Sequence, residues 1–243
     1  MADIVYKRIL VKLSGEALLG QQASGIDPAM VDKLAIELIE LHQAGVELGV
    51  VVGGGNLFRG AGLAAAGLDR VTADHMGMLA TVMNALALTD SLRRQGASAA
   101  VLTALEMPQV CDRYTQRDAR RRIAGGEIIV FSGGTGSPYF TTDTGASLRA
   151  IEIQADLLIK ATRVDGIYDK DPIKHSDAVR YTSLDFDQAI DQRLAVMDVA
   201  AMILCNDNAL DLVVCDINHK GALLELACGK SVGTRVTRKE VKQ

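Results

Sequence analysis

The sequence lacks the features that mark zinc-binding, secreted or membrane proteins. Its four cysteines form no CxxC pair and its four histidines are scattered, so no metal site is indicated. The start, Met1-Ala2-Asp3, has no basic segment followed by a long apolar one, which argues against a signal peptide. No apolar run approaches the roughly 20 residues that a membrane-spanning helix needs. We therefore expect a cytoplasmic protein whose cysteines are reduced.

Neither sign of charge is in large excess. The formal net charge is −4 over 243 residues, and the charged fraction of 23% is ordinary for a globular enzyme. The one basic concentration, Arg117 with Arg120–Arg122, lies on a helical pattern that starts at Thr115 and is typical of a solvated helix face. The composition argues against a broad nucleic-acid-binding surface.

Short apolar runs alternate with helical patterns over almost the whole chain. Runs such as Ile9–Val11, Val50–Val52 and Ile128–Phe131 are apolar at every position, which is typical of strands buried on both faces. The alternation predicts an α/β fold, a three-layer αβα sandwich with a largely parallel central sheet. No Pro- or Ser-rich linker interrupts it, so we expect one domain over residues 1–243, with an N-terminal lobe of about 1–150 and a C-terminal lobe of about 151–243.

Several element boundaries are readable from the residues. Asp27-Pro28 combines an N-cap carboxylate with a proline at the first helical position, and Gly45 closes that helix. Asp143 and Asp198 each precede a helical pattern as candidate caps. Val232–Val236 is expected to close the sheet as an edge strand. Further helices are expected at about 73–95, from 115, near 183–192, at 198–208 and at 221–228.

Four predicted strands end in turns that carry glycines and polar residues. In an open parallel sheet such turns converge at the carboxyl edge, where ligands bind. Glycines let backbone N–H groups approach an anion. Lysine and arginine at three of these turns (Lys12, Arg59 and Lys160) supply the charge that phosphoryl transfer needs. The turns are Lys12–Gly15, Gly53–Gly60, Ser132–Asp143 and Lys160–Asp171.

The turn Ser132–Asp143 is the most informative of the four. Tyr139 and Phe140 are suited to flank a flat ring, and Thr141 and Thr142 offer hydroxyls to oxyanions. The turn therefore predicts a pocket for a ligand that is both phosphorylated and planar. A plain strand-to-helix loop with turn glycines is the alternative.

Two common nucleotide-binding motifs are not supported. Gly229-Lys230-Ser231 is similar to the end of a Walker A loop, but that motif needs glycine where Leu224 stands. Gly60, Gly62 and Ala65 match the spacing of a dinucleotide-binding motif, yet no strand immediately precedes them. A P-loop kinase is therefore excluded, and a dinucleotide site has little support.

Several stretches resemble the bacterial uridylate (UMP) kinases, in order over nearly the whole chain. Lys12–Leu18 and Gly53–Gly60 are similar to elements of the wider amino-acid-kinase superfamily, which includes acetylglutamate kinase and aspartokinase. Asp74–Met78 and Gly136–Asp143 are the specific part of the resemblance, and Lys160–Tyr168 agrees with it. The resemblance implies the amino-acid-kinase fold and ATP-dependent phosphorylation of UMP to UDP in pyrimidine nucleotide biosynthesis.

The resemblance also implies residue roles. Lys12 and Lys160 would neutralise the transferring phosphoryl group, with Asp143 and Asp198 as accompanying carboxylates, Asp198 orienting the lysines. Mg²⁺ would be carried mainly by the nucleotide phosphates, with no metal site on the protein. ATP would contact Lys12, Leu13, Ser14, Gly15, Gly55, Arg59, Thr162, Tyr168 and Asp171. UMP would contact Gly54, Asp74 (near the ribose), Thr135, Gly136, Ser137, Pro138, Tyr139, Phe140, Thr141 and Thr142. Ser137 stands where many relatives carry asparagine.

Assembly and regulation are implied in the same way. The resemblance implies a homohexamer, allosteric activation by GTP and inhibition by UTP. No membrane or nucleic-acid partner is expected. Two alternatives stay open, namely a superfamily relative that phosphorylates a small carboxylate and a nucleotide-sensing regulatory protein without turnover. The activator region matches, by position alone, Gly20, Gln21, Gln22, Ala23, Ser24 and Gly25.

Overall fold

The structure is a computed structural model that describes residues 3–58, 67–194 and 196–239. Its strands are β1 (Arg8–Leu13), β2 (Glu47–Val52), β3 (Ala99–Thr103), β4 (Asp112–Arg113), β5 (Ile128–Ser132), β6 (Leu157–Thr162), β7 (Ser183–Asp185), β8 (Leu212–Asp216) and β9 (Thr234–Thr237). Its helices are the 3₁₀ turn η1 (Gly15–Leu18), α1 (Pro28–Gln43), α3 (Arg70–Arg94), α4 (Gln116–Ala124), α5 (Thr142–Glu152), α6 (Phe186–Asp191), α7 (Val199–Asp207) and α8 (Ala222–Ala227).

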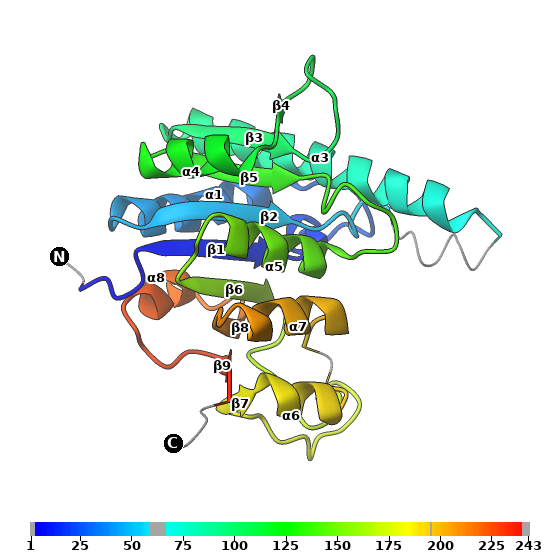
Figure 1. Ribbon diagram of the computed structural model, residues 1–243, viewed down its shortest axis with the longest axis vertical. Coiled ribbons are helices and arrows are strands. Elements are labelled where there is room, and N and C mark those ends of the chain that lie inside the picture. Colours follow the sequence, from blue (N-terminus) through cyan, green and yellow to red (C-terminus); the bar gives the residue numbers. More distant parts are fainter. Residues whose placement is uncertain (1–2, 59–66, 195, 240–243) are drawn as a thin grey trace.

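The strands form one sheet in the order β4-β3-β5-β2-β1-β6-β8-β9-β7 (Figure 1). The neighbouring strands pair in parallel, except β8 and β9, which are antiparallel. The predicted α/β class with a largely parallel sheet is therefore confirmed. Strand β1 lies at the centre, with β2 on one side and β6, from the predicted C-terminal lobe, on the other. The division into two lobes stays a prediction.

Helices cover both faces of this sheet (Figure 1). Val11 and Val50 point to the face covered by α1, α3 and α8, where they join one apolar core. Their neighbours Leu10 and Val51 point to the opposite face and join a second core with α4, α5, α6 and α7. Because successive strand residues alternate between two buried faces, the strands must be apolar at every position. This explains why the continuous apolar runs predict a three-layer fold.

Two of the three predicted capping residues cap their helices. Asp27 accepts a hydrogen bond from the first turn of α1, and Gly45, with φ of 101°, follows the end of that helix. Asp198 caps α7. Helix α5 differs, because its cap is Thr141, whose hydroxyl accepts from the next turn, and Asp143 is already inside the helix. The prediction of Asp143 as a cap is therefore wrong, since the threonine hydroxyl two residues earlier takes the capping role and leaves the carboxylate available for other side chains.

The C-terminal edge of the sheet also differs from the prediction. Strand β9 is not an edge strand, because it lies between β8 and β7. Strand β7 has only three residues, Ser183–Asp185, and no apolar run that would reveal it. The helix expected near residues 183–192 therefore starts later, at Phe186, after Asp185 has formed a capping box with Gln188.

Three further predictions concern the cysteines, membrane-spanning helices and the glycine motifs. All four cysteines are free, and Cys205 and Cys215 are buried in the two cores. Within the described ranges no helix is both long and apolar enough to cross a membrane. Four residues of the predicted glycine motifs, Arg59, Gly60, Gly62 and Ala65, lie outside the described residues.

Candidate active site

Two lysines lie side by side on adjacent strands. Lys12 in β1 and Lys160 in β6 are direct partners in the parallel register. Asp143, in the first turn of α5, lies between their side chains. Its Oδ1 is 2.6 Å from Lys12 Nζ and its Oδ2 is 2.7 Å from Lys160 Nζ. The structure thus brings three of the four predicted catalytic residues into one largely buried cluster.

The three charges perturb one another. Burial disfavours the ionised form of Asp143, but the charges of Lys12 and Lys160 outweigh it and hold the pKa of Asp143 below its usual range. Burial, reinforced by the charge of Lys12, lowers the pKa of Lys160 even though Asp143 opposes the change. Two ammonium groups and one carboxylate give a formal charge of +1. The cluster therefore has positive charge left for an anionic ligand.

Asp198 lies beside this cluster and contacts the start of α5. It caps α7, and its Oδ2 accepts hydrogen bonds from the hydroxyls of Thr144, at 2.8 Å, and Thr141. Two residues earlier, the carbonyl of Val196 accepts a hydrogen bond from Lys160 Nζ. The turn before α7 therefore holds Lys160 through its backbone, while Asp198 holds the helix that carries the bridging carboxylate. That Asp198 orients the lysines stays a prediction.

The turns after β1 and β2 approach each other closely. A Cβ on Gly15 would lie 2.4 Å from the carbonyl oxygen of Gly53, so only glycine fits there. Two buried amides fix the second turn: Asn84 Nδ2 donates to the Gly53 carbonyl at 2.7 Å and to Asn56 Oδ1 at 2.6 Å. Asn56 Nδ2 in turn donates to Asn84 Oδ1 at 3.0 Å and to the Gly25 carbonyl at 2.9 Å. This network attaches the Gly53–Gly55 turn to α3.

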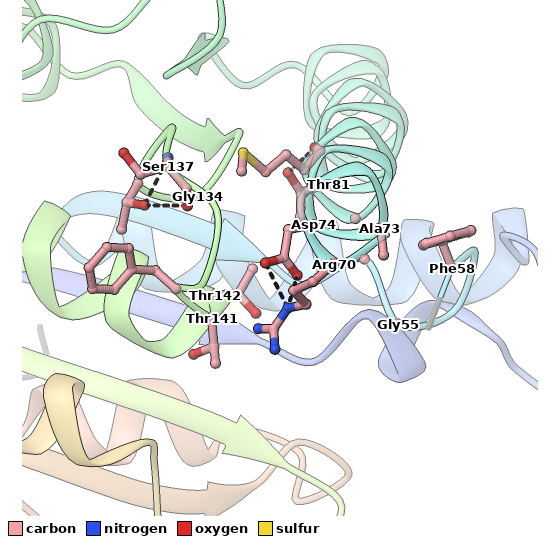
Figure 2. Close-up of a pocket in the computed structure, with 15 residues that line it drawn as sticks. Gly55, Phe58, Arg70, Ala73, Asp74, Thr81, Gly134, Ser137, Thr141 and Thr142 are labelled. Atoms are coloured by element: carbon pink, nitrogen blue, oxygen red, sulfur yellow. Dashed lines mark hydrogen bonds and ion pairs between the residues drawn. The ribbon is translucent and has the colours of Figure 1, made fainter. Parts of the chain in front are cut away.

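A cavity of about 270 Å³ lies between the start of α3 and the turn after β5 (Figure 2). Gly136, Pro138 and Tyr139 complete that turn. Gly55, predicted on the ATP side, lines the cavity together with Arg70, which the sequence did not indicate. The cavity is also lined by seven predicted UMP contacts: Gly54, Asp74, Thr135, Ser137, Phe140, Thr141 and Thr142.

Asp74 connects α3 to the turn after β5. Arg70 Nε donates to both of its carboxylate oxygens, at 2.9 and 2.8 Å. The backbone N–H of Tyr139 donates to Asp74 Oδ2 at 2.7 Å. In Figure 2 the Arg70 and Asp74 side chains extend from α3 toward Thr141 and Thr142. The cavity therefore has an anionic and a cationic group on one wall and hydroxyls on the other.

Three residues that support the site were not predicted. Arg70 and Asn84 act as described above, and the buried Arg149 donates to the Gly134 carbonyl at 3.2 Å. Asn84 had a readable signal, because it is a polar residue at a core position of α3, next to the buried Ala85. The pairing of Arg70 with Asp74 also had a signal, since they stand four residues apart on one helix, whereas the contact of Arg149 joins two separate segments and a single sequence does not reveal it.

The remaining predicted ATP contacts follow β6. Thr162 ends that strand, and its hydroxyl is bonded to the backbone of Val164. The Tyr168 hydroxyl donates to Asp165 Oδ1 at 2.6 Å. Asp171 Oδ1 accepts from the N–H of Ile173 at 3.0 Å. These contacts order the segment itself, and its role toward ATP stays a prediction.

Part of the predicted activator loop lines a separate cavity of about 600 Å³. Gly20 and Gln21 line it together with the cations Lys33 and Arg163. Arg163 is also attached to Glu16 through a hydrogen bond of 3.0 Å to the Glu16 carbonyl. The other loop residues are Gln22, Ala23, Ser24 and Gly25.

The described residues include no group of three or more His, Cys, Asp or Glu side chains that could hold a metal ion. In the lysine cluster both carboxylate oxygens of Asp143 already lie against ammonium groups. A divalent cation near these lysines would therefore need its oxygen ligands from a bound molecule.

A parallel α/β fold with a buried lysine cluster and glycine turns at its carboxyl edge defines a class of phosphoryl-transfer enzymes that stabilise charge rather than form a covalent intermediate. The chain belongs to the amino acid kinase family, whose sequence model matches residues 7–216. It is 56% identical to the uridylate kinase of Xanthomonas oryzae over 236 residues, covering 97% of this chain and 98% of that protein. It is 53% identical to the uridylate kinase of Pseudomonas aeruginosa, covering 95% and 94%.

Solved structures agree with these relatives. The UMP kinase of Bacillus anthracis superposes with a TM-score of 0.93 at 34% identity, covering 97% of each chain. The UMP kinase of Ureaplasma parvum gives a TM-score of 0.89 at 33% identity, covering 96% of this chain and 99% of that one. The predicted resemblance and fold are thereby confirmed.

Proposed function

We propose that this protein transfers the γ-phosphoryl group of ATP to UMP and forms UDP and ADP. The observation that carries the proposal is the buried cluster of Lys12, Asp143 and Lys160 beside a cavity lined by Asp74 and threonine hydroxyls. The relatives named uridylate kinase cover nearly the whole chain, which supports the same acceptor here.

The reaction needs no covalent intermediate. An oxygen of the UMP phosphate forms a bond to the γ-phosphorus of ATP, and the bond from that phosphorus to the bridging oxygen of ADP breaks. Lys12 and Lys160 stabilise the negative charge on the transferring group, because Asp143 fixes both ammonium groups before the substrates arrive. Burial of the cluster strengthens this effect, since water screens the charges less.

The two substrates are proposed to bind on different sides of the cluster. UMP occupies the 270 Å³ cavity, with its ribose at Asp74 and its phosphate toward Thr141 and Thr142. ATP contacts Lys12–Gly15, Gly55 and the segment that carries Thr162, Tyr168 and Asp171. Mg²⁺ would be held by the ATP phosphates rather than by Asp143, whose oxygens already lie against the two lysines, and it would neutralise part of the phosphate charge.

An acceptor panel tests the proposal against its alternatives. Release of ADP is measured with UMP, CMP, acetylglutamate and aspartate as acceptors. Turnover with UMP alone supports the proposal, and turnover with a carboxylate indicates a different member of the superfamily. Tight UMP binding without ADP release would indicate a nucleotide-sensing protein. The lysine cluster argues against that sensor, because sensing does not require charge stabilisation at a transferring group.

We further propose that copies of this chain associate, as a homohexamer, through α3. Met76, Leu79, Met83 and Leu86 are between 37% and 51% exposed and recur on one face of that helix. Such a contiguous apolar face is characteristic of an interaction surface.

Regulation by GTP and UTP is proposed at the 600 Å³ cavity, where Lys33 and Arg163 would attract phosphates. Free cysteines fit a reducing cytoplasm, where pyrimidine nucleotides would be made.

A further inference from the structure

Arg70 has two contacts that lead into the proposed acceptor site. Its Nε–H is shared between Asp74 Oδ1, at 2.9 Å, and Oδ2, at 2.8 Å. Its guanidinium carbon lies 5.4 Å from the centroid of the Tyr139 ring, within the range of a cation–π contact. Arg70 therefore joins α3 to the turn after β5 through a carboxylate and an aromatic ring.

The described residues leave one carboxylate oxygen of Asp74 with acceptor capacity to spare. An ionised carboxylate has about four acceptor positions, two on each oxygen. Within the described part of the chain, Oδ2 accepts from Arg70 Nε and from the N–H of Tyr139, whereas Oδ1 accepts only the shared Nε–H. Asp74 lines the cavity, so Oδ1 has the capacity to accept a hydrogen bond from a ligand hydroxyl (Figure 2).

The position of Arg70 is not explained by the stability of α3. Arg70 is the first residue of that helix, where a cation opposes the helix dipole, and Arg before Asp is the weaker order for a pair four residues apart. At the other end of α3, Arg94 pairs with Asp90 in the stronger order. Arg70 thus occupies an unfavourable helix position, and its contacts are with the cavity wall.

Tyr139 gives these contacts a second purpose. Its φ is 72°, a left-handed conformation that non-glycine residues adopt only at a cost and that the surroundings must maintain. The 2.7 Å hydrogen bond from its N–H to Asp74 holds this conformation from the opposite wall of the cavity. The orientation of Asp74 therefore decides both the shape of the turn and the direction of Oδ1.

We propose that Arg70 is a positioning residue for the ribose of the acceptor nucleotide. It fixes Asp74 so that Oδ2 holds the turn through Tyr139 while Oδ1 accepts a hydrogen bond from a ribose hydroxyl. The inference rests on the proposed function for the identity of the acceptor. It adds a residue that selects acceptors carrying ribose hydroxyls.

The test compares Arg70→Gln and Arg70→Lys with the wild-type protein. Arg94→Gln is the matched control, because it removes an arginine that also pairs with an aspartate four residues away on α3. KM and kcat are measured for UMP, for 2′,3′-dideoxy-UMP and for ATP, and calorimetry gives the dissociation constants of both acceptors without ATP. We expect Arg70→Gln to raise KM and Kd for UMP about 10-fold, since a hydrogen bond to a charged group is loosened.

The pattern across acceptors separates positioning from general support. Arg70→Gln should change the constants for dideoxy-UMP and ATP less than about twofold, and Arg70→Lys should restore part of the UMP affinity. Equal losses for UMP and dideoxy-UMP, or no loss for either, would overturn the role of Arg70. If the wild-type protein binds UMP but does not phosphorylate it, the proposed function fails, and the dissociation constants still decide the role of Arg70.

Discussion

At the scale of single residues, one carboxylate shared by two lysines dominates the candidate site. Asp143 touches both ammonium groups at 2.6 and 2.7 Å, so it fixes their positions without neutralising both charges. Removing one member of such a buried cluster changes the charge and hydrogen bonding of the others. We therefore expect a substitution in this cluster to cost more free energy than the loss of one surface ion pair would.

Substitution of Lys12 tests the charge-stabilising role. Lys12→Ala removes one preorganised positive group, and we expect kcat for UMP phosphorylation to fall about 10²-fold or more. Lys230→Ala is the control, because that exposed lysine pairs with Glu225 away from the cluster and should leave kcat unchanged. Near-normal turnover of Lys12→Ala at saturating substrates would contradict the assignment.

The pH dependence tests the lowered pKa of Lys160. Because its pKa is below the 10.5 of an ordinary lysine, Lys160 loses its proton earlier as the pH rises, and the site loses positive charge. We expect kcat/KM to fall on the alkaline side before an ordinary lysine would titrate. Lys160→Arg should move this fall to higher pH, since a guanidinium stays charged.

Because the wild type and Lys160→Arg are measured with the same substrates, the titration of the substrates affects both pH profiles equally. The same lowered pKa affects stability in the opposite direction from activity. As the pH rises, Lys160 loses its proton in the folded state before it does in the unfolded state. Its contribution to the free energy of unfolding therefore rises with pH between the folded and unfolded pKa values. An alkaline limb that is identical in wild type and Lys160→Arg would contradict the prediction.

At the scale of elements, α3 has three distinct surfaces. Its first turns line the cavity, its middle buries Asn84 against the turn after β2, and its outer face exposes an apolar stripe. The asparagine pair adds side-chain hydrogen bonds to the few backbone bonds of the turn after β2, among them Leu57 N–H to the Gly54 carbonyl.

Asn84→Ala should destabilise the protein. The substitution leaves the carbonyl of Gly53 and the amide of Asn56 without their buried partner, which costs about 2–4 kcal/mol of unfolding free energy. The measurement is urea unfolding followed by circular dichroism. Asn206→Ala is the control, because the side chain of that half-buried asparagine on α7 donates one hydrogen bond, to Asp187 at the surface, and its loss should change stability by less than about 0.5 kcal/mol. Equal stabilities of the two variants would refute the role of the network.

At the scale of the whole molecule, the sequence predicts the layers better than the sheet edges. The central strands can be predicted because burial on both faces makes every position apolar, as in Ile9–Val11. Strand β7 was missed because three residues carry no pattern, and β9 was therefore placed at the edge. That Lys12 and Lys160 lie together can be predicted because the ends of parallel strands converge, whereas the contact between Asp74 and Tyr139 joins residues 65 positions apart.

The apolar face of α3 gives a prediction for assembly. Met83→Glu places a charge in the middle of that face, and we expect it to lower the assembly mass measured by light scattering while circular dichroism stays unchanged. Ile173→Glu is the control, because Ile173 is an isolated exposed residue in the segment after β6. A wild-type protein that is monomeric, or a variant that keeps the full mass, would contradict association through α3.

The strand register that places Lys12 beside Lys160 also has a consequence for the synthesis of the protein on the ribosome. The three charges are synthesised in the order Lys12, Asp143, Lys160, so the carboxylate is present before the second cation has to be buried beside the first. At a translation rate of about 5–20 residues per second, Lys160 follows Lys12 by roughly seven to thirty seconds. A nascent chain that ends before β6 has one lysine of the pair, so catalytic competence arrives only with the C-terminal part of the sheet.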